Sequence, residues 1–337
     1  MSGIKDSYQR TIDYLRVSIT DRCNLRCVYC MPADGIMPMD HKDILSYEEI
    51  IRIVRIATGI GVKKVRITGG EPLARKNIIH LISEISNIDG IRDLSLTTNG
   101  ILLSRYADKL VEAGLERINI SLDSLRPDRF KEITRGGELN LVMQGIESAE
   151  KAGLTPIKIN MVPIHGLNSD EIEDFAKLTL QLPYQIRFIE FMPFGTEGLW
   201  SPERFVSVEE TKSIVERVGT LTPVKMKRSG PAIYFRFDSA PGVIGFISPI
   251  SNHFCGECNR LRLTADGKLR PCLFSETEID LKPALRGGAP DDELERLIKL
   301  SIEVKPKGHD IGSRFTELLS LMKSKECSRR PMSRIGG

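Results

Sequence analysis

Six short runs of β-branched and apolar residues recur in the first two thirds of the chain, and segments with helical apolar spacing separate them. The runs predict strands at residues 14–20, 63–68, 92–97, 117–122, 156–162 and 185–191. Apolar residues repeating every three or four positions predict helices around residues 50–57, 78–85, 102–110, 141–152 and 172–180. This alternation predicts an α/β protein with a parallel sheet, which is either a barrel or a flat doubly wound sheet.

Polar and apolar residues alternate within several of these strands. In the first strand, Leu15 and Val17 alternate with Arg16 and Ser18. The same alternation recurs at 63–68, 117–122 and 156–162. Parallel strands that are buried on both faces normally consist of near-continuous apolar residues, so a polar face indicates a solvated cavity. We therefore expect an open, incomplete (β/α)6 TIM-like barrel around a large charged ligand.

The alternation of strand and helix stops near residue 205. Short strand-like runs with many Gly and Pro turns follow at 224–227, 232–237, 243–248 and 260–264. Two helical segments, at 291–302 and 315–324, precede a polar tail at 328–337. The pattern predicts a barrel domain at residues 1–205 and a smaller α+β region at residues 206–337, which we expect to form a second layer over the barrel mouth.

Composition and charge exclude several classes of protein. The chain has 337 residues, of which 41% are hydrophobic and 28% charged, and its net charge of +3 is too small for a nucleic-acid footprint. The longest segment without charged residues, 239–256, is interrupted by Pro and Gly, so we expect no membrane span. The polar first ten residues contain no secretory signal, and we expect a cytoplasmic protein, either a monomer or a homodimer.

Six of the seven cysteines form two triplets. Cys23, Cys27 and Cys30 follow the first expected strand in a C-x3-C-x2-C arrangement. Clustered thiolates suit an iron-sulfur cluster or zinc, but structural zinc sites require four ligands. A cluster held by three thiolates keeps one iron open to another ligand, and this vacancy points to chemistry.

The second triplet is Cys255-x2-Cys258-x13-Cys272. A structural zinc site would need a fourth ligand here too, and the candidates are Cys327, His253 and His309. Their spacing matches no zinc site known to us. A second cluster with three cysteine ligands is the sharper hypothesis, and zinc stays open.

The first triplet, with Tyr29 before its third cysteine, resembles the signature of the radical S-adenosylmethionine (SAM) superfamily. In that superfamily a Gly-Gly-Glu-Pro segment after the second strand binds the methionine part of SAM, and this chain has Gly69-Gly70-Glu71-Pro72 at that position. The glycines alone would indicate only a tight turn. Together the two motifs imply the radical SAM fold.

The whole pattern resembles the GTP 3′,8-cyclase family of molybdenum cofactor biosynthesis. The resemblance rests on the segments 14–24 and 254–267, on Pro271-Cys272-Leu273-Phe274 and on the terminal Gly336-Gly337. It implies a lyase that converts GTP to (8S)-3′,8-cyclo-7,8-dihydroguanosine 5′-triphosphate. A 5′-deoxyadenosyl radical formed from SAM would remove H3′ of GTP, and the C3′ radical would attack C8.

The resemblance also implies roles for individual residues. The cluster ligands are Cys23, Cys27, Cys30, Cys255, Cys258 and Cys272. The SAM contacts are Tyr29 through its backbone, Gly70, Glu71, Ser121 and Met192. The GTP contacts are Arg16, Arg66, Thr97, Lys158, Arg260, Leu261 and Arg262. Catalytic roles fall to Arg260, Arg262, Gly336 and Gly337, the last two on a tail that enters the active site.

The implied cofactors are two 4Fe-4S clusters, each with three Cys ligands, and SAM. The implied partners are GTP, an electron donor that reduces the clusters, and the cyclic pyranopterin monophosphate synthase that receives the product. Two alternatives stay open. One is a different radical enzyme with an auxiliary cluster, such as a peptide-modifying enzyme, and the other is a non-catalytic electron carrier.

Overall fold

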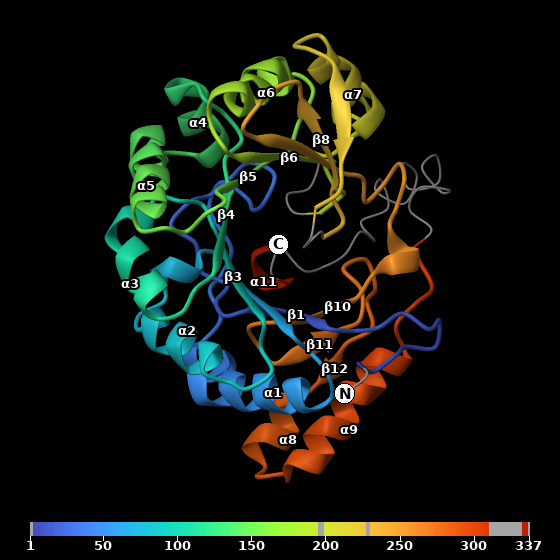
Figure 1. The fold of residues 1–337 in the computed structure, drawn as a ribbon. Coiled ribbons are helices and arrows are strands. Elements are labelled where there is room, and N and C mark those ends of the chain that lie inside the picture. Colours follow the sequence, from blue (N-terminus) through green and yellow to red (C-terminus); the bar gives the residue numbers. More distant parts are fainter. Residues whose placement is uncertain (1–2, 195–198, 227–229, 310–331, 336–337) are drawn as a thin grey trace.

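A computed structural model describes residues 3–194, 199–226, 230–309 and 332–335, whose strands form one curved sheet wrapped around a central space (Figure 1). The strands of this sheet lie in the order β12-β11-β10-β1-β2-β3-β4-β5-β6-β9-β8-β7. Within the described residues the end strands β12 and β7 do not pair, so the barrel is open.

The first six strands and helices follow the alternation expected from the sequence. The strands are β1 (Tyr14–Ser18), β2 (Lys64–Thr68), β3 (Asp93–Thr98), β4 (Arg117–Ser121), β5 (Lys158–Met161) and β6 (Gln185–Ile189). The helices are α1 (Tyr47–Gly59), α2 (Ile78–Ser86), α3 (Ala107–Glu112), α4 (Pro127–Thr134), α5 (Leu139–Lys151) and α6 (Ile172–Gln181). The six predicted strands and the barrel are confirmed. Helix α4 was missed, because few of its eight residues are apolar and only one short face is buried.

The C-terminal part contains further strands and helices. The strands are β7 (Leu221–Val224), β8 (Ile233–Phe237), β9 (Val243–Ile247), β10 (Arg260–Leu263), β11 (Lys268–Arg270) and β12 (Ile279–Asp280). The helices are α7 (Val208–Glu216), α8 (Lys282–Arg286), α9 (Asp291–Glu303) and α11 (Met332–Ile335). Helices α7, α8 and α11 and strands β11 and β12 were missed. The strand expected at 224–227 ends at its first residue, and the helix expected at 315–324 lies outside the described residues.

The prediction of a second layer over the barrel mouth was wrong. Strand β10 pairs in parallel with β1, and β9 pairs in parallel with β6, so the C-terminal strands extend both edges of the same sheet. Eight neighbouring strands from β10 to β9 are therefore parallel, and antiparallel strands continue the sheet at each end. The physical reason is that an open sheet leaves unpaired backbone groups at its edges, and further strands satisfy them.

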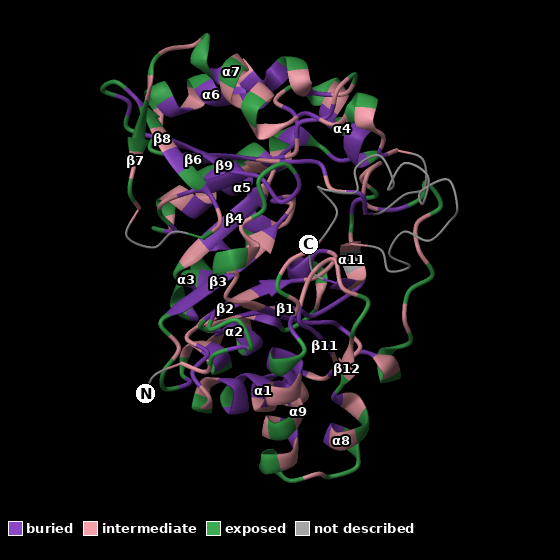
Figure 2. Cartoon of the chain, turned by 90° about the vertical axis from the view of Figure 1, so that its right-hand side faces the viewer, coloured by how far each residue is buried: buried purple, intermediate pink, exposed green. Residues whose placement is uncertain are grey.

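The helices pack on the outer face of the sheet, where the apolar strand residues form the core (Figure 2). Helix α1 shows how the sequence sets this arrangement. Ser46 and Glu49 form a capping box at its start, and Ile50, Ile53 and Val54 are fully buried against the sheet. Burial of each such side chain stabilises the fold by about 1.5–3 kcal/mol. With the apolar residues turned outward to the helices, the polar residues of the same strands face the barrel interior.

Candidate active site

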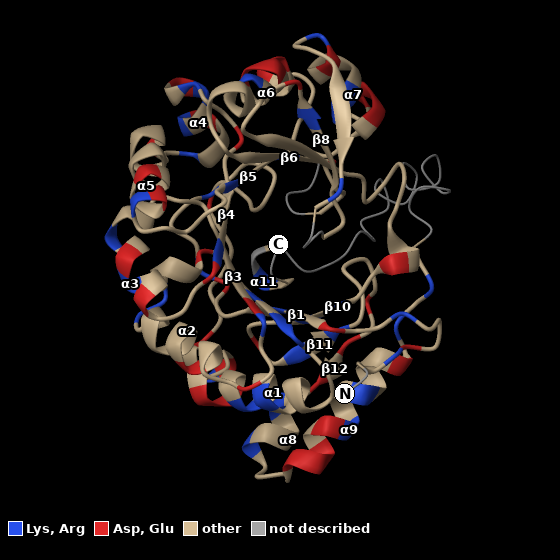
Figure 3. Cartoon of the chain, viewed as in Figure 1, with Lys and Arg blue, Asp and Glu red and all other residues tan. Residues whose placement is uncertain are grey.

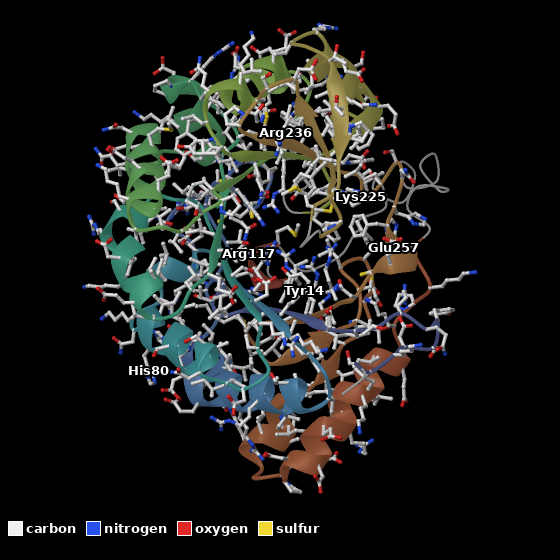
Figure 4. All side chains as sticks on the ribbon, viewed as in Figure 1. Tyr14, His80, Arg117, Lys225, Arg236 and Glu257 are labelled. Atoms are coloured by element: carbon white, nitrogen blue, oxygen red, sulfur yellow. The ribbon has the colours of Figure 1, made fainter. Side chains whose placement is uncertain are left out.

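The inward faces of the strands line a large cavity of about 690 Å³, a size typical of small-molecule sites. Tyr14 and Arg16 on β1 lie beside Arg260 and Arg262 on β10, and Arg16 lies beside Arg66 on β2. Figure 4 shows Tyr14 and Arg117 pointing into the central space, whereas His80 lies on the outer surface. The alternation within the strands therefore predicted the polar interior correctly.

The first cysteine triplet lies on the loop after β1, at one side of this cavity. Cys23, Cys27 and Cys30 are half-buried and all line it. The amides of Cys30 and Met31 donate to the carbonyl of Cys27 at 2.9 and 3.2 Å, which folds the loop back on itself. Burial raises the pKa of Cys23 to about 11 and raises the pKa of Cys27 well above its ordinary value. Such sulfurs become thiolates only when a cation such as iron compensates their charge.

The Gly-Gly-Glu-Pro segment packs directly against the cysteine loop. The amide of Gly70 donates to the carbonyl of Thr20 at 2.7 Å, and that of Glu71 donates to Arg22 at 2.8 Å. A Cβ at Gly70 would lie 2.3 Å from the Arg22 carbonyl oxygen. The second glycine of the motif is therefore required by a close approach of two backbones, beyond any turn preference.

Glu71 connects this segment to the cysteine loop through a buried carboxylate. It accepts hydrogen bonds from the amides of Leu73 and Asn99 and from the Thr98 hydroxyl, at 2.7–3.0 Å. The Asn99 side chain donates to Asn24 at 2.8 Å and approaches the Cys23 sulfur at 3.7 Å. Burial raises the pKa of Glu71 to about 7, although these donors oppose the shift. Glu71 thus shapes the loop that holds Cys23.

Asp123 is a neighbouring site residue that sequence analysis missed. The Tyr29 hydroxyl donates to its carboxylate at 2.5 Å, and the Val162 amide donates to the other oxygen at 2.9 Å. Burial raises the pKa of Asp123 to about 6. The contact joins the cysteine loop to the ends of β4 and β5. Asp123 continues the inward-facing positions of β4, so the strand alternation could have identified it.

The second triplet lines the same cavity from the C-terminal strands. Cys255 and Cys258 lie at a 3-10 turn (Cys255–Glu257) before β10, and Cys272 follows β11. Burial raises the pKa of Cys255. Burial also acts to raise the pKa of Cys258, but the positive charges of Lys305 and Arg260 outweigh it and lower this pKa. The antiparallel pairing of β10 with β11 brings the three cysteines together across a gap of thirteen residues.

The chemistry of the cysteine side chains determines which metal groups the two triplets could hold. In the part of the chain that the structure describes, no three His, Cys, Asp or Glu side chains converge on one ion position. Three thiolates on one zinc would each lie about 2.3 Å from it and so converge tightly. Cysteine thiolates are also the ligands of iron-sulfur clusters, which are larger than one ion, so the donor set of each triplet fits such a cluster.

Positive charge accumulates between the two triplets. Figure 3 shows Lys and Arg positions on the strands around the central space and many Asp and Glu positions on the outer helices. Lys64 pairs with Asp13 at 2.9 Å, and Arg117 pairs with Asp93. Burial and the nearby Arg260 together lower the pKa of Arg262 to about 10. A buried basic cavity of this kind is complementary to a polyanion.

Two family models match this chain. One, described as the Radical SAM superfamily, covers residues 17–179, and the other, described as Molybdenum Cofactor Synthesis C, covers residues 184–311. Relatives named GTP 3',8-cyclase, from Alkaliphilus oremlandii (strain OhILAs) and Thermodesulfovibrio yellowstonii (strain ATCC 51303 / DSM 11347 / YP87), are each 52% identical to it. The matches span 334 and 336 residues, or 99% of this chain and 100% of each relative. The chain belongs to the GTP 3′,8-cyclase family.

A solved structure of similar fold is SuiB from Streptococcus suis bound to S-adenosylmethionine, with a TM-score of 0.60. It is 16% identical, and the match covers 85% of this chain and 67% of SuiB. At this identity the similarity shows the fold alone. The predicted radical SAM fold is confirmed, and with it an iron-sulfur cluster and SAM as cofactors. None of the described helices is long and apolar enough to cross a bilayer.

Most residues that resemblance to the family singled out line the cavity together. They are Arg16, Tyr29, Arg66, Gly70, Glu71, Thr97, Ser121, Lys158, Met192, Arg260 and Arg262, with all six clustered cysteines. Leu261 is different, because its fully buried side chain packs in the hydrophobic core on the opposite face of β10. Only its backbone could contact a ligand in the cavity. Gly336 and Gly337 lie outside the described residues, but the preceding helix α11 contacts β1, and Met332 lines the cavity.

Sequence analysis missed further polar residues that line the cavity. Arg187 on β6 donates to Asn119 at 2.6 Å, and burial lowers its pKa to about 10. Asn160 on β5 lies beside Arg187 in the sheet register. Its side-chain oxygen and the Thr97 hydroxyl are buried without a hydrogen-bond partner among the described residues. The alternation within β5 and β6 carried this signal, since both residues occupy inward positions.

Proposed function

We propose that this chain converts GTP to (8S)-3′,8-cyclo-7,8-dihydroguanosine 5′-triphosphate, a radical SAM reaction early in molybdenum cofactor biosynthesis. One observation carries the proposal: the two cysteine triplets line one cavity, and a basic strand surface lies between them. An electron carrier would need neither this surface nor the packed Gly-Gly-Glu-Pro segment. A peptide-modifying enzyme would not need so many buried cations.

In this proposal, residues 1–205 supply the radical and residues 206–337 supply the second cluster. The family models divide the chain between residues 179 and 184, ahead of β6, and our boundary lies after that strand. Cys23, Cys27 and Cys30 would hold a 4Fe-4S cluster, which would supply the electron that cleaves SAM. Tyr29, Gly70, Glu71, Ser121 and Met192 hold SAM at the ends of the strands.

GTP binds between the two triplets. Arg16, Arg66 and Lys158 attract the triphosphate, and Thr97 offers its unpartnered hydroxyl. Cys255, Cys258 and Cys272 would hold the second cluster, which would supply a binding site for the guanine base. Arg260 and Arg262 would act beside it. Leu261 contributes through its backbone. This arrangement holds C3′ of the ribose near the SAM site, and positioning of this kind is a large part of catalysis.

The bond changes require an external electron supply. SAM would supply the 5′-deoxyadenosyl radical that removes H3′ as a hydrogen atom. Addition of the C3′ radical to the C8=N7 double bond would leave a radical on N7, and one electron and one proton would convert it to N7–H. A low-potential one-electron donor therefore acts with this chain. The product passes to a cyclic pyranopterin monophosphate synthase, and the chain acts as a monomer or a homodimer.

The hydrogen transfer provides the test of this function. With both clusters reconstituted under anaerobic conditions, and with reductant, SAM and GTP deuterated at C3′, we expect deuterium in 5′-deoxyadenosine by mass spectrometry. GTP deuterated at C2′ is the control and should give none. Protein that cleaves SAM but transfers no deuterium from C3′ would contradict the proposed function.

Lys158 should make GTP binding depend on pH. Burial, together with Arg117 and Arg187, lowers the pKa of Lys158 to about 7, so the free enzyme loses this charge above neutrality. A triphosphate favours the ammonium form, so binding takes up a proton and weakens as the pH rises above 7. Where this dependence is steepest, the Kd for GTP should rise by about tenfold per pH unit.

Calorimetric titration of the reconstituted enzyme with GTP from pH 7 to 9, in buffers of different ionisation enthalpy, measures both the affinity and the proton uptake. Lys158→Met should bind weakly with a flatter profile, because it has no proton to gain. Equal pH dependence in Lys158→Met and the unaltered enzyme would exclude Lys158 as the source.

A further inference from the structure

The short segment after helix α9, residues 305–307, contacts every stretch of chain that carries a cysteine of the second triplet. Lys305 lies at its start and is only 3% exposed. Its ammonium group donates to the carbonyl oxygens of Arg260 at 2.8 Å and Pro271 at 2.5 Å. Arg260 follows Cys258 by two residues, and Pro271 immediately precedes Cys272. One side chain therefore ties together the two strands that position these two sulfurs.

Arg10, near the N-terminus, forms further hydrogen bonds to the same segment and to the stretch that carries Cys255. Its guanidinium donates to the carbonyl of Cys255 at 2.7 Å and to those of Pro306 and Lys307 at 2.7 and 2.9 Å. Asp6 orients it through an ion pair at 2.6 Å, with both side chains buried. The backbone around all three cysteines is thus held by two cations that meet at residues 305–307.

The charge of Lys305 needs an explanation beyond these two hydrogen bonds. A buried ammonium group is costly unless an anion lies nearby. No carboxylate within the described ranges forms an ion pair with Lys305. Burial lowers the pKa of Lys305, and the groups that oppose this shift are Cys258, with which its side chain forms a hydrogen bond, and Cys272. Lys305 is also the foremost positive group acting on Cys258. The ammonium group therefore faces the sulfurs that would carry the negative charge of a cluster.

We propose that Lys305 is a positioning residue of the second cluster, which holds Cys258 and Cys272 at the correct separation and raises the cluster's reduction potential. This inference rests on the proposed function, since it requires a cluster at the second triplet. The sign follows from electrostatics. Reduction adds negative charge to the cluster, and a nearby fixed positive charge stabilises the reduced form.

The test compares Lys305→Met with Lys305→Arg. Lys268→Met is the matched control, because Lys268 lies on the adjacent strand β11 but pairs with Glu278 at 3.3 Å, away from the cysteines. The readouts are iron per chain after reconstitution and an EPR-monitored redox titration of the second cluster. SAM cleavage by the first cluster reports that the barrel is folded.

The iron content of Lys305→Met should fall from about eight irons per chain toward about four. In any second cluster that the variant retains, the ratio of oxidised to reduced form at a fixed potential should rise at least about tenfold. For a one-electron couple, this corresponds to a reduction potential at least about 59 mV lower. Lys305→Arg should recover most of both properties. Iron content and potential in Lys305→Met equal to those of Lys268→Met would overturn the inference. Only about four irons in the unaltered chain would instead overturn the second cluster itself.

Discussion

Replacing Cys272 with Ala should remove about half of the bound iron and abolish cyclised product, while slow SAM cleavage persists. Cys272 is one of three sulfurs proposed for the second cluster, and it lines the same cavity as Cys23, Cys27 and Cys30. Loss of one of three ligands leaves the cluster with two protein thiolates, and the site cannot hold it. The first cluster uses a separate loop after β1 and should assemble normally.

The size of the effect on product follows from positioning. A displacement of about 1 Å in a bound substrate can reduce the rate about 100-fold, and loss of the whole guanine-binding group should cost at least that. The measurements are iron content, EPR of the reduced protein, 5′-deoxyadenosine formation and product formation. The complementary variant Cys27→Ala should lose SAM cleavage itself. Unchanged iron content in Cys272→Ala would contradict a second cluster.

Deleting Gly336 and Gly337 should abolish the cyclised product and leave iron content and GTP affinity nearly unchanged. The preceding helix α11 contacts β1 and lies at the centre of the view in Figure 1. Ile335 is only 1% exposed, and Arg334 donates to the carbonyl of Met37 at 2.7 Å. Met332, at the start of this helix, lines the cavity, and the deletion removes the two residues that follow Ile335 in the sequence.

The expected loss of product is at least about 100-fold, the cost of a misplaced catalytic group. GTP affinity should change by less than about twofold, since α11 and the basic strands remain. Gly336→Ala with Gly337→Ala is the matched control for length, and it shows whether small side chains are required. Full turnover in the truncated protein would show that the glycines have no role in cyclisation.

The strand residues illustrate how far sequence reasoning reached. Period-two alternation depends only on the geometry of an extended chain, so the inward positions of Arg16, Arg66 and Lys158 could be predicted. The same rule could have identified Arg187 as an inward-facing residue. It could also have placed the Leu261 side chain on the face of β10 that points away from the cavity. Resemblance to the family implied that all of residues 260–262 contact GTP, and the alternation within β10 was not used to separate them.

Other site residues depend on contacts between distant segments. Arg10 reaches the carbonyl of Cys255, and Lys305 reaches Arg260 and Pro271, across separations that no local pattern records. Each has a buried cationic side chain, which in the sequence looks like any exposed Lys or Arg. The partnership of Tyr29 with Asp123 is hidden for the same reason.

The sequence alone determined the first six strands, five of the six helices among them, the polar barrel interior and the two cysteine triplets, because periodicity and ligand spacing are local properties of the chain. The tertiary structure decided that the C-terminal strands extend both edges of one sheet and that both triplets line one cavity. It also decided that residues 305–307 join the strands of the second triplet. These features depend on which strands pair and which charges are buried together, and such contacts are fixed only when segments far apart in the chain pack against one another.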